Sequence, residues 1–207
     1  MEHFDNLDDY IADLKAQLEA NPSCGNTHYN LGVAYLSRRD FMEAEREFLD
    51  AVAHSPRLAE GYVQLGGIAL QRNDLESCLN YNIQATQQRP FFAVPWGNIG
   101  FILMQQGDYD KAHKALKKAL KYDHNFAQAQ ATMSSLHIAM GDYEEADKLL
   151  RKILEKELHF GPAWNNKAIV DAHFGNWEDA AKCIVKAEES GFEVPEDFKK
   201  EVEENNK

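Results

Sequence analysis

Histidine and cysteine are the residue types in this sequence best suited to metal binding or nucleophilic catalysis. Eight histidines and three cysteines are present. The cysteines, Cys24, Cys78 and Cys183, lie far apart, and there is neither a C-x-x-C pair nor a pair of histidines four residues apart. Zinc sites and disulfide frameworks draw on closely or regularly spaced ligands, so we expect neither here. His173 is the histidine of most interest, because it is predicted to face a groove described below.

Motifs for catalysis are also missing. The sequence contains no G-x-x-x-x-G-K-[ST] loop for phosphate, no H-E-x-x-H motif for zinc and no G-x-S-x-G turn for a nucleophile. Gly61, Gly66 and Gly67 do not have the spacing of a dinucleotide-binding loop and lie in a predicted helix. We therefore expect no cofactor and a protein that is not an enzyme.

The charge is acidic and concentrated at the two ends of the chain. The 207 residues include 22 Lys plus Arg and 34 Asp plus Glu, which gives a formal net charge of −12. Residues 1–20 and 188–204 supply most of the excess acid. Nucleic acid requires a concentrated positive surface, so we expect no nucleic-acid partner. A basic run at residues 111–121 is the one alternative, although lysines on an outer helix face usually contact only water.

The sequence also lacks the features of a membrane or secreted protein. No stretch is apolar over the roughly 18 residues that a membrane-spanning helix requires. The first residues have neither the basic nor the apolar segment of a secretory signal. We therefore expect no membrane partner and a cytoplasmic localisation, which also suits three unpaired cysteines.

An internal period of 34 residues organises most of the chain. Five windows of this length follow one another without a gap, at 25–58, 59–92, 93–126, 127–160 and 161–194. The eighth and twentieth places of every window hold a small residue, and the seventeenth holds a large apolar one. Small residues at fixed places allow two helices to approach closely.

Each window contains two segments of helical periodicity separated by a short polar turn. Gly107, Gly141 and Gly175 lie in three of these turns, where glycine ends the first helix. Pro56 and Pro90 end the second helix of the first two windows. The pattern predicts a helix–turn–helix unit, repeated five times.

The first window carries a set of residues that resembles the signature of the tetratricopeptide repeat family: Leu31, Gly32, Tyr35, Ala44, Phe48, Ala51 and Pro56. Trp96 and Trp164 supply the aromatic residue at place four in two later windows. The departures include His28 at that place and Lys167 at an apolar place. The resemblance implies an all-α fold, an α-solenoid of tandem helix–turn–helix repeats wound as a right-handed superhelix.

The ends of the chain fit this organisation. Residues 1–24 are predicted to form a capping half-repeat helix, and residues 195–207 a C-terminal capping helix with an acidic tail. Phe198 and Val202 are expected to cover the last repeat while the acidic residues face water. The acidic ends therefore serve solubility in this interpretation.

The resemblance further implies a concave groove lined by places two, five, six, nine, twelve and thirteen of each repeat. Place six holds uncharged hydrogen-bonding side chains in all five repeats: Asn30, Gln64, Asn98, Thr132 and Asn166. A carboxamide can pair with both the N–H and the C=O of a peptide unit, so this row could hold an extended ligand. The alternative is that asparagine simply fits an exposed helix surface, although it is a poor helix former.

Apolar residues lie between these polar side chains. Val33, Phe101 and Met104 are predicted to form part of a groove floor, and Gly67 leaves room beside Phe101 for an apolar side chain of a partner. The alternative is that these residues pack on neighbouring first helices. Places two, five and six hold no lysine or arginine, so a clamp for a terminal carboxylate is not expected.

The sequence thus predicts a non-enzymatic adaptor or scaffold that binds an extended or helical peptide segment of another protein in its groove. Two alternatives remain open. One is a structural protein that uses the groove for contacts between its own copies, and the other is a regulatory subunit of a separate enzyme. We expect a monomer or a weak homo-oligomer.

Overall fold

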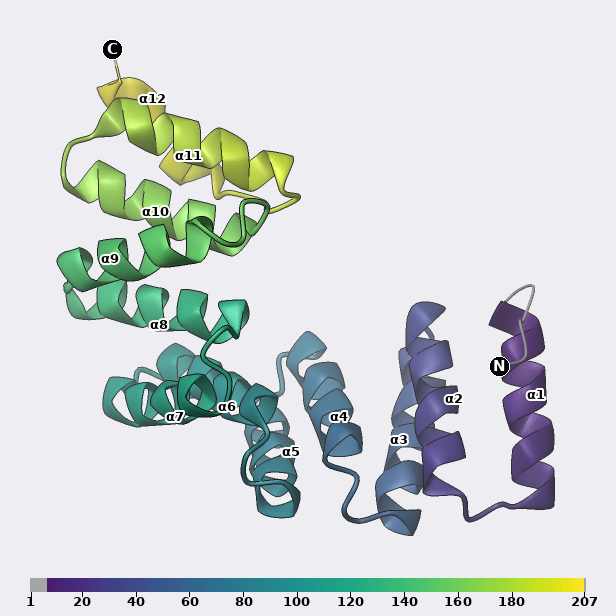
Figure 1. Cartoon of the computed structure of the whole chain (residues 1–207). Coiled ribbons are helices and arrows are strands. Elements are labelled where there is room, and N and C mark those ends of the chain that lie inside the picture. Colours follow the sequence, from purple (N-terminus) through teal and green to yellow (C-terminus); the bar gives the residue numbers. More distant parts are fainter. Residues whose placement is uncertain (1–6, 207) are drawn as a thin grey trace. The chain divides into compact units, whose positions relative to one another are not determined.

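The computed structural model describes residues 7–206, and these residues form twelve α-helices and no strand. The predicted all-α class is therefore confirmed. Figure 1 shows the two helices of a repeat side by side, as for α2 and α3 or for α8 and α9. Their bounds are α1 Leu7–Ala20, α2 Gly25–Ser37, α3 Phe41–His54, α4 Ala59–Gln71, α5 Leu75–Gln88, α6 Ala93–Gln105, α7 Tyr109–Tyr122, α8 Ala127–Met140, α9 Tyr143–Leu154, α10 Gly161–His173, α11 Trp177–Glu189 and α12 Glu196–Asn205.

The chain forms two compact units, residues 1–102 and residues 103–207, with the boundary inside α6. Each of the five 34-residue windows holds two of the helices. In the first unit, α2 packs against α3 and α4 against α5; in the second, α8 packs against α9 and α10 against α11.

The first unit has a core in which close helix approach depends on a glycine. Leu14, Leu31 and Phe48 are almost completely buried in one cluster with residues of α4. A Cβ atom added at Gly32 would lie 2.7 Å from the Phe48 ring, which is fully buried. Only glycine therefore lets α2 approach α3 this closely.

Among the described residues of the second unit, one apolar cluster lies between α9 and α10 and another between α10, α11 and α12. Val202 of α12 is 1% exposed and Phe198 packs against the same cluster. Their spacing of four residues places both on one side of α12. The last helix is thereby fixed to the repeat before it.

The turn between the two helices of each repeat has a left-handed residue at the same place. Arg39, Asn73, Gly107, Gly141 and Gly175 are 34 residues apart and have φ angles of 61°, 57°, 78°, 83° and 76°. Gly141 is the C-cap of α8 in this conformation. The period seen in the side chains is therefore also a period of the backbone.

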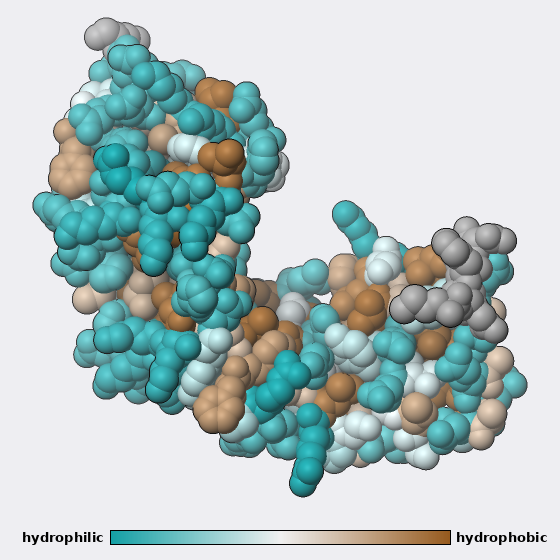
Figure 2. Space-filling view, viewed as in Figure 1, coloured by the Kyte–Doolittle hydropathy of each residue, from teal (hydrophilic) through white to brown (hydrophobic). Residues whose placement is uncertain are grey.

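In the described part of the chain, no helix combines the length and apolar character required to span a bilayer. Figure 2 shows hydrophobic residues visible between hydrophilic ones over α2, α3 and α4. Several large apolar side chains are exposed, including Met42 at 78% and Leu158 at 65%.

Candidate functional site

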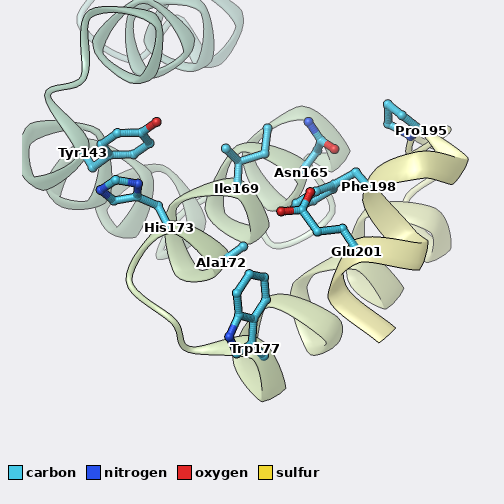
Figure 3. Close-up of a pocket in the computed structure, with 9 residues that line it drawn as sticks. All are labelled: Tyr143, Asn165, Ile169, Ala172, His173, Trp177, Pro195, Phe198 and Glu201. Carbon is cyan, nitrogen blue, oxygen red and sulfur yellow. The ribbon is translucent and has the colours of Figure 1, made fainter. Parts of the chain in front are cut away.

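A pocket of about 410 Å³ opens in the second unit, beside the first helix of the last repeat. Figure 3 shows its lining side chains, which come from the start of α9, from α10, from the start of α11 and from α12. They are Tyr143, Asn165, Ile169, Ala172, His173, Trp177, Pro195, Phe198 and Glu201. The volume lies within the range of ordinary ligand pockets, about 300–1,000 Å³.

Helical spacing explains why α10 contributes four of these residues. Asn165, Ile169, Ala172 and His173 follow one another at steps of four, three and one residues, so they lie along one side of the helix. They occupy places five, nine, twelve and thirteen of the repeat, four of the six places that the family resemblance assigns to the concave face. The packing of α12 on the last repeat brings Phe198 and Glu201 to the same side.

The pocket combines aromatic rings with hydrogen-bond acceptors. The ring of His173 stacks on that of Tyr143 with the centroids 3.5 Å apart and an interplanar angle of 6°. Asn165 Oδ1 is buried and has no hydrogen-bond partner among the described residues. The Glu201 side chain forms no ion pair or hydrogen bond with any residue of the described range, and only its backbone carbonyl accepts one. In Figure 3 its carboxylate points toward the middle of the pocket.

The predicted polar row is exposed at one end of the chain and buried at the other. Asn30 is exposed, Gln64 and Asn98 are half-buried, and Thr132 and Asn166 are 5% and 7% exposed. The Thr132 hydroxyl donates to the Gln128 carbonyl of its own helix at 2.9 Å. A ligand can therefore reach this row at its first three members more easily than at its last two.

Two asparagines of the row, Asn98 and Asn166, make hydrogen bonds between helices of the chain itself. Asn98 Nδ2 donates to Asn82 Oδ1 at 2.9 Å, from α6 to α5. Asn166 Nδ2 lies 2.9 Å from Ser134 Oγ and 2.8 Å from Ser135 Oγ, and 3.1 Å from the Ala131 carbonyl oxygen, all on α8. These two asparagines thus stabilise the packing of neighbouring repeats, which is a role that the sequence reasoning missed.

The predicted apolar floor is partly open. Val33 is 37% exposed, and a Cβ atom at the exposed Gly67 would meet no other atom within 4 Å. Phe101 is half-buried and packs against a cluster that contains Ala69 and Ile102, and Met104 is also half-buried. His173 is exposed and is the member of the predicted set that lines the pocket.

His28, Glu47 and Asp50 form the one group of metal-binding residue types in the described chain whose ligand atoms lie within 4.8 Å of one another. His28 Nδ1 is 2.7 Å from Glu47 Oε2, and His28 Nε2 is 2.9 Å from the Pro22 carbonyl oxygen. Both ring nitrogens thus face acceptors, an arrangement that favours a protonated imidazole over a metal ligand. Arg46 makes a further contact of 3.2 Å to the other oxygen of Glu47.

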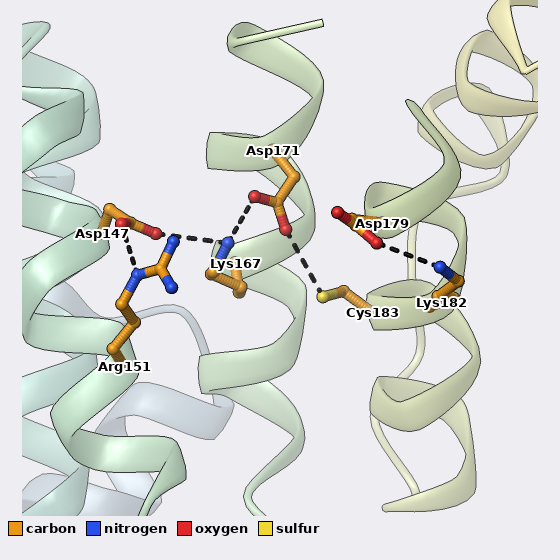
Figure 4. Close-up of polar contacts among 7 residues, drawn as sticks. All are labelled: Asp147, Arg151, Lys167, Asp171, Asp179, Lys182 and Cys183. Atoms are coloured by element: carbon orange, nitrogen blue, oxygen red, sulfur yellow. Dashed lines mark hydrogen bonds and ion pairs between the residues drawn. The ribbon is translucent and has the colours of Figure 1, made fainter. Parts of the chain in front are cut away.

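A second buried charged group surrounds Lys167, the residue that departs from the apolar pattern (Figure 4). Its Nζ forms ion pairs with Asp171 on the same helix and, at 3.2 Å, with Asp147 of α9. Arg151 also pairs with Asp147 at 2.7 Å, and Cys183 Sγ donates to Asp171 Oδ2 at 3.6 Å. Burial acts to lower the pKa of Lys167, but Asp171 and Asp147 outweigh it and raise that pKa. The lysine therefore stays charged and is unsuited to act as a nucleophile.

Comparison with known proteins identifies the repeat. One model of the tetratricopeptide repeat matches residues 103–168, and a second matches residues 11–59 and 29–77. The matched segments together span more than half of the sequence. The chain belongs to the tetratricopeptide repeat family. No curated protein matches the sequence.

Solved structures of other proteins resemble this chain over most of its length. Pseudomonas aeruginosa pilF has a TM-score of 0.74 and 19% identity, over 86% of this chain and 81% of its own. YrrB, described as a TPR protein with an unusual peptide-binding site, has a TM-score of 0.66 and 15% identity, over 92% and 97% of the two chains. In the Cut9–Hcn1 hetero-tetramer of APC/C, the match has a TM-score of 0.78 and 13% identity and covers 88% of this chain and 36% of that one.

Identities this low show the fold alone. They confirm the predicted α-solenoid of tandem helical repeats, and this fold supports a protein-interaction module in general.

Two residues of the pocket, His173 and the apolar Ile169, were expected from the sequence to face the groove. Asn165 and Ala172 are at places already assigned to the concave face, so the signal for them was present. Glu201 was expected only to face water, and Phe198 only to cover the last repeat. Their contribution depends on how α12 packs, which the repeat pattern does not specify.

Proposed function

We propose that this chain is a non-enzymatic adaptor that binds a peptide segment of another protein on the exposed sides of its first helices. The observation that carries this proposal is the pocket beside α10, which is lined by aromatic rings and the Glu201 carboxylate and where the buried Asn165 Oδ1 has no partner among the described residues. A mostly apolar pocket with a few polar groups is the usual form of a ligand site. The buried ionic groups at His28 and Lys167 are already paired within the chain, which suits a structural role for them.

The exposed members of the predicted row offer a separate surface within the first unit. Asn30 and Gln64 can each offer a donor and an acceptor to a peptide backbone, and Val33 and Gly67 lie open beside them. Phe101 is half-buried and supplies further apolar contact in the first unit in this proposal, and the half-buried Met104 does so in the second unit. One such hydrogen bond contributes about 0.5–1.5 kcal/mol, so binding requires several contacts at once.

The proposal can be tested with a library of random twelve-residue peptides selected against the full chain. Affinities of the selected peptides are then measured by calorimetry for the wild type and for Ile169→Ala, which removes apolar surface from the pocket. Val185→Ala is a matched control, because Val185 is 53% exposed on the second helix of the same repeat and does not line the pocket.

We expect Ile169→Ala to weaken binding about fivefold or more, as the loss of buried methyl groups predicts, and Val185→Ala to leave it unchanged. Circular dichroism checks that both variants fold. Selected peptides that bind all three proteins equally would contradict a site at α10, and failure to select any peptide would contradict peptide binding. Sedimentation in the same buffer distinguishes a monomer from the alternative of contacts between copies.

A further inference from the structure

We infer that the pocket beside α10 takes the guanidinium group of an arginine side chain from the partner protein. This inference rests on the proposed function, which supplies a peptide at this surface. It names the chemistry of the residue that enters the pocket.

The polar groups that line the pocket are suited to a donor. Asn165 Oδ1 is buried without a partner, and the Glu201 carboxylate has none in the described residues. A buried acceptor left without a hydrogen bond is unfavourable, so a ligand that donates to it gains more than one that does not. Arginine carries five N–H donors in one planar group, which is enough to supply both acceptors.

The aromatic residues suit a planar cation. Tyr143, Trp177 and Phe198 line the pocket from three different helices. The face of an aromatic ring attracts a cation, and guanidinium stacks on rings more readily than ammonium does. The chain itself shows this contact elsewhere, where the guanidinium carbon of Arg89 lies 3.8 Å from the centroid of the Phe92 ring.

The charge around the pocket also favours a positive ligand. No lysine or arginine lines it. Asp197 and Glu204 precede and follow Glu201 by four and three residues on α12, so the three carboxylates share one side of that helix. The two lysines of the helix are Lys199, which pairs with Glu188 and Glu196, and Lys200. A cleft with charge of one sign attracts ligands of the opposite sign.

The test uses the isotope-labelled full chain and four synthetic pentapeptides, which are acetylated and amidated alanine peptides with one central residue. That residue is arginine, lysine, leucine or citrulline, and citrulline has nearly the shape of arginine without its charge. Amide shifts in the NMR spectrum locate binding on α10 and α12 and give the dissociation constants. We expect the arginine peptide to bind about fivefold or more tightly than the citrulline and leucine peptides, and more tightly than the lysine peptide.

Two variants test whether the charge of Glu201, and not a change in folding, determines the affinity. Glu201→Gln should weaken the arginine peptide about fivefold or more and leave the leucine peptide unchanged, because only the charge is removed. Glu203→Gln makes the same change at an exposed residue of α12 outside the pocket and should have no effect.

The outcomes keep the two proposals distinct. If the arginine peptide binds no better than leucine or citrulline, or if Glu201→Gln leaves its affinity unchanged, the arginine inference is overturned. Peptides selected from the random library can still bind at α10 in that case, and the proposed function then stands. Preference for lysine over arginine would also overturn the choice of guanidinium.

Discussion

At the scale of single residues, the hydrogen bonds of His28 depend on whether its ring is protonated. Both of its ring nitrogens lie beside acceptors, from Glu47 and from the Pro22 carbonyl, and both can donate only in the protonated form. Burial acts to lower the pKa of His28, but these two acceptors and the charges of Glu47 and Asp50 outweigh it and raise that pKa above 6.5. The ring of His54 stacks on that of His28, and Arg46 contacts Glu47. Both groups therefore lie close to the ion pair between His28 and Glu47.

The raised pKa of His28 predicts that stability falls as the pH rises. The folded state holds the proton more tightly than the unfolded chain, so the stabilisation is complete below about pH 6.5 and is lost as the pH passes through the higher folded pKa. We expect the free energy of unfolding in denaturant to decline above that pH in the wild type. His28→Gln should lose this part of the decline, whereas a control at the exposed His124 should keep it. Parallel curves for wild type and His28→Gln would show that His28 is not the cause.

The three cysteines differ in reactivity for physical reasons. Burial raises the pKa of Cys78 to about 11, and burial together with the charge of Asp171 raises the pKa of Cys183 to about 12. Cys24 is half-exposed at the start of α2, and hydrogen bonds from Thr27 lower its pKa. Because the thiolate is the reactive form, iodoacetamide should label Cys24 at least about tenfold faster than the others in the native protein. Mass spectrometry of Cys24→Ser should then show no fast labelling, and fast labelling of that variant would refute the assignment.

At the scale of the helical elements, the turn of the first repeat carries avoidable strain. Arg39 has a φ of 61°, a conformation that Asn73 also adopts in the second repeat and that glycine adopts in the last three repeats. A residue with a side chain costs about 1–2 kcal/mol in this conformation. Glycine avoids that cost, but it loses more conformational entropy on folding, so only part of the free energy is recovered. Arg39→Gly should therefore raise the free energy of unfolding by about 0.5–1 kcal/mol, measured in urea. Arg57→Gly is the control, because it removes the same charge from an exposed residue with ordinary φ, and an equal gain there would point to charge instead.

The helices also show which features could be predicted from the sequence and which could not. The 34-residue period predicted the helix pairs, the family and the turn glycines, because those features depend on neighbours in the sequence and on small residues such as Gly32. It did not predict the ion pairs between His28 and Glu47 or between Lys167 and Asp147, which join different helices. Nor did it predict the pocket: Phe198 and Val202 were expected to cover the last repeat, but the repeat pattern does not specify where Glu201 then lies relative to α10. The burial of Asn166 was missed for the same reason, since it follows from contact with α8.

At the scale of the whole molecule, each of the two units has its own core. Leu31 and Phe48 belong to the cluster of the first unit, and Leu150 and Ile184 belong to clusters of the second. Repeat proteins derive their stability from each repeat and its immediate neighbours, so a local change is felt mainly nearby. A single free energy of unfolding is then an incomplete description of such a chain.

Hydrogen exchange can test this division directly. Leu31→Ala removes a side chain that is 1% exposed and should cost about 2–5 kcal/mol in the first unit, and Leu150→Ala, at a fully buried residue, should do the same in the second. We expect the loss of amide protection to be concentrated in α2 and α3 for the first variant and in α9 and α10 for the second. The two variants serve as controls for each other, because the same type of side chain is removed from each unit. Equal loss of protection throughout both units would mean that the chain unfolds as one cooperative block, because neither core could then open without the other.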